Sequence, residues 1–177
     1  MQNRLVVAIA VAGTCALCAL PLRAQIAALR SPDASRIARA VELEKQAVEL
    51  HAQPKRAYEA AQLHIQSASL RDLEDPQAVQ SLAMAAHLLG YADRPLEARH
   101  TMEEAATRAL AMGDVVRAAA AYTEAAFFAQ KAQNKGELNR LGRKAILLSS
   151  SPLLRPEERQ AILGRFTTTP TFGVLLK

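Results

Sequence analysis

The fold is decided by residues 76–130, which read PQAVQSLAMAAHLLGYADRPLEARHTMEEAATRALAMGDVVRAAAAYTEAAFFAQ. Apolar residues recur in this stretch at three- and four-residue spacing, which places them on one face of a helix. Three stripes result: Leu82, Ala85, Ala86 and Leu89; Ala98, Met102, Ala105, Ala106 and Ala109; and Val115, Ala118, Tyr122, Ala125 and Ala129. Pro76 and Pro95 stand where helices begin, and Gly90 and Gly113 stand where they end. The stretch therefore predicts three consecutive amphipathic helices joined by brief turns.

Similar signals continue on both sides of this stretch. Further helices are expected to begin near Ser31-Pro32-Asp33, Pro54, Gly136 and Pro156, which makes about seven in all. Their expected inward faces include Ile37, Ala40, Val41, Ala47, Val48 and Leu50; Ala57, Tyr58, Ala61, Ile65 and Ala68; and Leu138, Leu141, Ala145 and Leu148. With 50% apolar residues, no Trp and only 7 glycines, the composition suits close-packed helices rather than a turn-rich sheet. We therefore predict an all-α fold of antiparallel helix hairpins.

Two segments resemble tetratricopeptide repeats. In one, the turn Gly113-Asp114 is followed by Ala, a large residue and Ala on one helix face, namely Ala118, Tyr122 and Ala125. In the other, Asp75-Pro76 resembles a repeat boundary and introduces a first helix. Small residues at such positions let paired helices approach closely. The repeat frame stays open, because residues 95–112 form a second helix in one frame and a first helix in the other.

The resemblance covers residues 76–130 well and residues 35–150 loosely. It implies a short, right-handed, tetratricopeptide-like α-solenoid over residues 25–166. Residues 167–177 form an apolar tail that is expected to cap the last helix or to be disordered. The resemblance also implies, by analogy, that the chain binds another protein or a peptide.

The N-terminal segment, residues 1–24, has the features of a secretory signal peptide. Arg4 gives the start one positive charge, residues 5–20 are uncharged and mostly apolar, and Ala24 provides a small residue before the cut. We expect a periplasmic or secreted protein whose mature chain begins at Gln25. One alternative is an uncleaved membrane anchor, although this apolar run would reach only about 24 Å across a roughly 30 Å hydrocarbon layer. The other is a lipoprotein modified at Cys15.

The net charge of +5 is unevenly distributed. Residues 25–130 carry 11 basic and 14 acidic side chains, whereas residues 131–177 carry 9 basic and 3 acidic ones. Nucleic-acid-binding proteins usually have a denser basic face with aromatic side chains for stacking, so no nucleic-acid partner is expected. Arg140, Arg143 and Lys144 share one side of their helix and form a candidate docking surface for an acidic partner or anionic lipid headgroups.

No motif in the sequence indicates a reaction, a cofactor or a metal. Cys15 and Cys18 both lie in the predicted signal segment, and the histidines lack the i, i+4 spacing of a helical metal site. There is no Gly-rich phosphate loop and no Gly-x-Ser-x-Gly motif. The expected function is thus a non-catalytic interaction module of the cell envelope. The rival is an enzyme or small-ligand carrier with dispersed polar residues, such as His87, His100 and Glu103.

Some tetratricopeptide proteins hold a partner's C-terminal carboxylate with Lys, Arg and Asn side chains spread over several first helices. Here Asn139 and Arg143 could contribute, but the earlier helices carry His87, His100 and Glu103 at comparable places, a departure that argues against such a clamp. The basic helix face and these dispersed polar residues together make the candidate partner-binding set: Arg140, Arg143, Lys144, His87, His100 and Glu103.

Overall fold

A computed structural model describes residues 34–167, and every regular element among them is helical. The α-helices are α3 (Ala34–His51), α4 (Ala57–Ser69), α5 (Pro76–Tyr91), α6 (Pro95–Ala111), α7 (Val115–Lys131), α8 (Lys135–Ser149) and α9 (Pro156–Thr167). A 3-10 turn, Pro54–Arg56, precedes α4. The predicted all-α fold is therefore confirmed. The predicted signal segment (1–24) and tail residues 168–177 lie outside the described residues.

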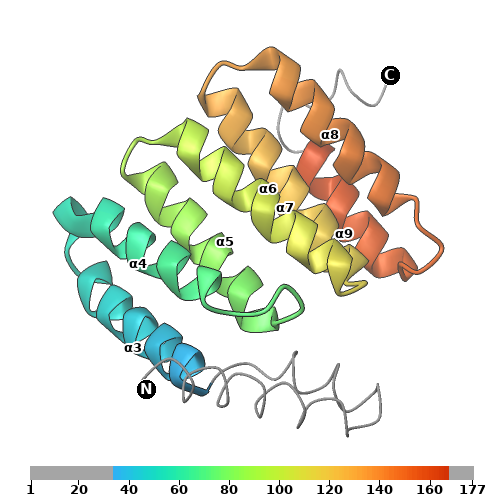
Figure 1. The fold of residues 1–177 in the computed structure, drawn as a ribbon. Helices are drawn as coiled ribbons and strands as arrows, with labels where there is room; N and C mark the ends of the chain where they lie inside the picture. The colour runs from blue at the N-terminus through green and yellow to red at the C-terminus, as the bar shows by residue number, and fades with distance from the viewer. Residues whose placement is uncertain (1–33, 168–177) are drawn as a thin grey trace, which may run out of the picture. The chain divides into compact units, whose positions relative to one another are not determined.

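Each helix from α3 to α8 packs against the next one along the chain, and the chain reverses direction at each short turn (Figure 1). Side chains also join every second helix. Glu44 of α3 accepts a hydrogen bond from Ser81 of α5, and Arg108 of α6 donates to the Ala68 carbonyl of α4. The helices therefore form two layers, with α3, α5 and α7 in one and α4, α6 and α8 in the other. Within residues 34–167, no helix is long and apolar enough to cross a membrane.

The turns that follow α5, α6 and α7 recur at one constant interval along the sequence. Asp93, Gly113 and Gln133 each adopt a positive φ, of 57°, 75° and 57°. In each turn the next amide donates to a carbonyl five residues back, with N···O distances of 2.8 Å (Arg94 to Leu89), 2.9 Å (Asp114 to Ala109) and 2.9 Å (Asn134 to Ala129). This bond and a residue in the left-handed conformation end a helix while satisfying one of its last carbonyls. The three turns are therefore equivalent, and we call the interval from Asp93 to Gly113 the helix period.

The buried positions of α5 to α8 follow the same helix period. Three sets of equivalent residues are buried throughout: Ala78, Ala98, Ala118 and Leu138; Leu82, Met102, Tyr122 and Gly142; and Ala85, Ala105, Ala125 and Ala145. Each of these helices therefore buries the same three positions, and the third of them is alanine in all four helices. This equivalence explains why residues 95–112 fit either repeat frame, since first and second helices carry the same pattern.

The predicted inward faces of α5 and α6 are buried throughout. The prediction is wrong at Val41 and Val48 of α3, which are 53% and 57% exposed, and at Tyr58 of α4, which is 40% exposed. The buried stripe of α3 is Ala40, Leu43, Ala47 and Leu50. Val41 and Val48 each follow a buried alanine, and adjacent helical residues point about 100° apart. The core face of α3 is thus narrower than the apolar pattern suggested.

Candidate binding groove

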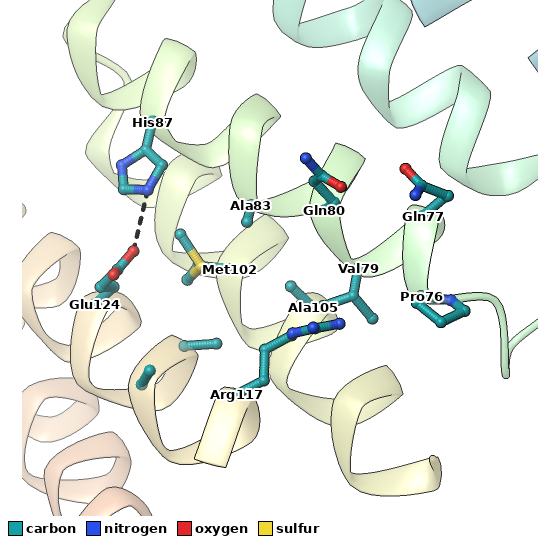
Figure 2. Close-up of a pocket in the computed structure, with 12 residues that line it drawn as sticks. Pro76, Gln77, Val79, Gln80, Ala83, His87, Met102, Ala105, Arg117 and Glu124 are labelled. Carbon is teal, nitrogen blue, oxygen red and sulfur yellow. Dashed lines mark ion pairs between the residues drawn. The ribbon is translucent and has the colours of Figure 1, made fainter. Parts of the chain in front are cut away.

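A hollow of about 390 Å³ lies between α5 and α7 and has α6 as its floor (Figure 2). Met102 and Ala105 form this floor. The walls carry mainly small or apolar side chains, namely Val79 and Ala83 from α5 and Ala120 and Ala121 from α7. Gln77, Gln80 and Arg117 supply polar groups around them. The first hollow is therefore apolar at its base and polar at its rim, as ligand sites commonly are.

One ion pair spans the groove. His87 of α5 lies with its Nε2 3.1 Å from Oε2 of Glu124 on α7 (Figure 2). The hydrogen bond to Glu124 raises the pKa of His87, because it stabilises the protonated imidazole. Both residues also line a second hollow, so this pair stands between the two.

The second hollow has a volume of about 460 Å³ and is lined by aromatic side chains. Tyr91 and Phe127 are 69% and 41% exposed, whereas Phe128 is buried. Lys131 completes this end, with its Nζ 5.1 Å from the centroid of the Phe127 ring. The two hollows together form what we term the α5–α7 groove, whose α5 wall runs from Pro76 to Tyr91, about 22 Å at 1.5 Å per residue.

The groove is open because α5 and α7 carry alanines at positions where the next helices, α6 and α8, carry charged side chains. Between α6 and α8, the residues that lie one helix period beyond Ala83 and Ala120 are Glu103 and Arg140. Arg140 Nη2 lies 2.6 Å from Glu103 Oε2. The position equivalent to Val79 is Arg99, which pairs with Glu137 of α8 at 2.7 Å. The same helix geometry therefore gives a filled surface between α6 and α8 and an open one between α5 and α7.

The filled surface is an ion-pair network. Lys144 Nζ lies 3.3 Å from Glu103 Oε1 and 4.9 Å from the centroid of the Tyr122 ring, which belongs to the α7 floor. The hydrogen bond from Arg140, followed by that from Lys144, lowers the pKa of Glu103 to about 2. Arg140 also contacts Glu137, with an N···O distance of 2.6 Å. The positive charges of Arg140 and Lys144 are thus matched by carboxylates of the same molecule.

The sequence-predicted site residues fall on different surfaces. Glu103, Arg140 and Lys144 come together between α6 and α8, whereas His87 lies in the α5–α7 groove. Arg143 is exposed and makes no ion pair with any residue in the described range. His100 is exposed on the α4–α6 side, where it lines a hollow of about 400 Å³. The six residues therefore do not form one site.

The sequence interpretation missed most of the groove, including Glu124, Tyr91, Phe127, Phe128 and Lys131. An alignment of the chain with itself, shifted by one helix period, would have indicated the groove. This alignment pairs Ala83 with Glu103 and Ala120 with Arg140, and so shows that α5 and α7 lack the large charged side chains of α6 and α8 at these positions.

Among the residues that the structure describes, no three His, Cys, Asp or Glu side chains are grouped so as to hold a metal ion. No protein-family model, curated protein or solved structure matches this chain.

Proposed function

We propose that this protein is a non-catalytic interaction module that binds a peptide segment of a partner protein in the α5–α7 groove. The observation that carries this proposal is that the groove between α5 and α7 is open. Between α6 and α8, the equivalent space is closed by Glu103 and Arg140. Because Ala83 and Ala120 occupy the equivalent positions in α5 and α7, an apolar surface stays accessible to a ligand there.

The dimensions of the groove favour a peptide over a small metabolite. A length of about 22 Å matches an extended segment of about seven residues at 3.3 Å per residue. Apolar side chains of such a segment would contact the partly exposed Ala83 and Ala120 on the two walls. Its backbone amides and carbonyls would meet Gln77, Gln80 and the His87–Glu124 pair at the rim. A small molecule would occupy one hollow only.

The resemblance to tetratricopeptide repeats supports the same proposal, since such solenoids hold peptides against helix faces of this kind. One feature departs from that family. A helix pair here repeats over the interval from Asp93 to Gln133, which is longer than the tetratricopeptide period of about 34 residues. We accordingly propose a tetratricopeptide-like solenoid with longer repeats.

Export to the periplasm or secretion belongs to the same proposal and is supported by the apolar run of residues 5–20 and the small residue Ala24. N-terminal sequencing of the protein recovered outside the cytoplasm is expected to begin at Gln25 or within a few residues of it. An intact Met1 in the membrane fraction would contradict cleavage and favour an anchor.

The groove can be closed by copying the neighbouring surface into it. The double variant Ala83→Glu/Ala120→Arg places the Glu103–Arg140 pair at equivalent positions and fills the first hollow. Heptapeptides selected from a random display library against the wild-type protein are expected to bind this variant at least about tenfold more weakly, as measured by fluorescence anisotropy.

The matched control is Glu103→Ala/Arg140→Ala, which opens the α6–α8 surface and leaves the groove unchanged, so peptide affinity is expected to be retained. A library that yields no binding peptide, or peptides that bind the closed variant as well as the wild type, would overturn the proposal. Co-purification of a metabolite that the closed variant fails to retain would instead favour a small-ligand carrier.

A further inference from the structure

Three of the chain's 7 aromatic residues gather at one end of the groove. We propose that the hollow lined by Tyr91, Phe127 and Phe128 takes an aromatic side chain of the partner peptide, and that Lys131 pairs with an acidic residue next to it. This inference rests on the proposed function and names the chemistry of the ligand, an acidic–aromatic peptide.

Exposure of the aromatic rings is the first argument. Tyr91 and Phe127 leave 69% and 41% of their area in solvent, although both border a hollow with an apolar wall. Exposed aromatic residues beside a pocket are typical of the few side chains that dominate binding energy at interfaces. The Phe127 and Phe128 rings lie 5.9 Å apart at an interplanar angle of 59°. A further ring can pack against their faces and edges in the offset or T-shaped arrangements that aromatic pairs prefer.

Gly90 fixes where the Phe128 ring lies in this hollow. A Cβ atom at Gly90 would collide with the Phe128 ring, so glycine allows that ring to lie directly against the α5 backbone. The equivalent residues are Leu110 in α6 and Gln130 in α7. A side chain of either kind at position 90 would force the Phe128 ring, which lines the hollow, to move from this position. The close approach at Gly90 is therefore specific to the helix that lines the hollow.

The charges around the groove indicate that an acidic residue of the peptide lies next to its aromatic residue. His87 lies against Glu124 and is charged when its imidazole is protonated, and Arg117 at the opposite end lies 3.4 Å from Asp114. Lys131, in contrast, makes no ion pair with any residue in the described part of the chain, and its ammonium lies over the Phe127 ring. A ligand carboxylate beside the inserted ring would meet this ammonium and gain a charge-assisted hydrogen bond.

The test uses heptapeptides selected from a random display library against the full-length wild-type protein. We expect the selected peptides to share an aromatic residue with Asp or Glu within two positions of it. Replacing that aromatic residue by alanine, or the acidic residue by lysine, is expected to weaken binding about tenfold or more. Phe127→Ala and Lys131→Glu in the protein are expected to weaken binding to the same extent.

Matched controls come from neighbouring positions. Leu147→Ala removes an exposed apolar side chain at the position of α8 equivalent to Phe127, and Lys135→Glu makes the same charge change as Lys131→Glu on an exposed residue of α8. Both controls are expected to bind as the wild type does. Circular dichroism melting of each variant verifies that it is folded.

Two outcomes separate the inference from the proposed function. Peptides that lose affinity for Ala83→Glu/Ala120→Arg but bind Phe127→Ala and Lys131→Glu normally would overturn the aromatic–acidic inference and leave the groove proposal standing. A library without any binding peptide would overturn both. Chemical-shift changes in a ¹H–¹⁵N spectrum on adding N-acetyl-Asp-Phe-amide are expected at Gly90, Phe127 and Lys131, and changes confined to other residues would contradict the inference independently.

Discussion

The Nε2 atoms of His51 and His64 lie 3.1 Å apart, so the two rings share one hydrogen bond across the α3–α4 interface. One nitrogen must donate and the other accept, which requires that at least one ring be neutral. His64 is 5% exposed, and its Nδ1 is buried without a hydrogen-bond partner in the described part of the chain. Burial, and next the neighbouring His51, lower the pKa of His64 to about 4.

This pair predicts that the protein loses stability in mild acid. An unfolded histidine titrates near pKa 6.5, so below that pH the unfolded state binds a proton that folded His64 excludes. The free energy of unfolding is expected to fall as the pH decreases from about 6.5 to 4, by at most about 3 kcal/mol from this residue. Urea unfolding at about pH 7 and pH 4.5 measures it.

The control variants are His64→Phe, which removes the titrating group, and His100→Phe, which changes an exposed histidine. The stability of His64→Phe is expected to depend less steeply on pH than that of the wild type, while His100→Phe keeps the wild-type slope. Equal slopes for all three proteins would show that His64 is not the group responsible.

A second prediction concerns the Glu103–Arg140 pair, which joins α6 to α8 at 2.6 Å. Arg140→Ala is expected to lower the free energy of unfolding at neutral pH by about 1 kcal/mol, since the pair is only partly buried. The pKa of Glu103 should rise from about 2 toward its ordinary range, because its main hydrogen-bond donor is lost. Carboxyl ¹³C titration by NMR measures that change.

Glu103 is an acid whose pKa is lowered in the folded state, so its contribution to stability is present above about pH 4.5 and disappears as the pH falls toward 2. The matched control is Arg155→Ala, which removes an exposed pair between residues three apart. It is expected to change stability little. An Arg140→Ala protein as stable as this control, with an unchanged Glu103 titration, would contradict the prediction.

The helices were predictable because their signals are local. Asp75 and Asp114 accept hydrogen bonds from amides of the first turns of α5 and α7, as the helix-start patterns indicate. The Ala118, Tyr122 and Ala125 stripe is buried as predicted, because the two alanines let neighbouring helices approach closely around the Tyr122 ring. The burial of Val41 and Val48 was predicted wrongly, because the sequence does not distinguish an exposed apolar residue of α3, the first described helix, from a core residue.

The groove was not predictable from the same signals. Whether Arg140 forms an exposed basic surface or an ion pair depends on Glu103, which is distant in the sequence, and this pairing appears only when α6 and α8 are placed in one layer. Conversely, the open space beside Ala83 and Ala120 has no mark in the sequence other than alanine, which also dominates the core. Only a comparison between equivalent helices distinguishes alanines that line the groove from alanines of the core.

A third prediction uses the repeated turns. Asp93, Gly113 and Gln133 share a positive φ, but only Gly113 adopts it without a steric penalty. Gln133→Gly is expected to raise the free energy of unfolding by about 0.5–1 kcal/mol, and Gly113→Ala to lower it by about 1 kcal/mol. A Cβ at Gly113 would meet no atom within 4 Å, so backbone strain is the sole cause. Thermal melting of both variants measures these effects, and a stabilising Gly113→Ala would refute the argument.

The last prediction concerns Glu44, which ties α3 to the next two helices. Its Oε1 accepts hydrogen bonds from Ser67 of α4 at 2.8 Å and from Ser81 of α5 at 2.6 Å, and its Oε2 accepts one from Arg71 at 3.1 Å. The three donors belong to buried residues. Without Glu44 the buried hydroxyls of both serines would lose their acceptor, and Arg71 would keep only its pair with Asp75.

Glu44→Ala is therefore expected to cost about 2–3 kcal/mol, the penalty of leaving buried polar groups unsatisfied. Glu44→Gln should cost less, because its amide oxygen still accepts from both serines, although its NH2 group stands where Oε2 accepted from Arg71 and cannot accept that hydrogen bond. Glu42→Ala, an exposed change on the same helix, is the control and should be close to neutral. Hydrogen exchange is expected to accelerate first in α3, since α3 has no other described helix on its outer side. If exchange in α3 is unchanged and Glu44→Ala is as stable as Glu42→Ala, the hydrogen bonds of Glu44 do not hold α3 against α4 and α5.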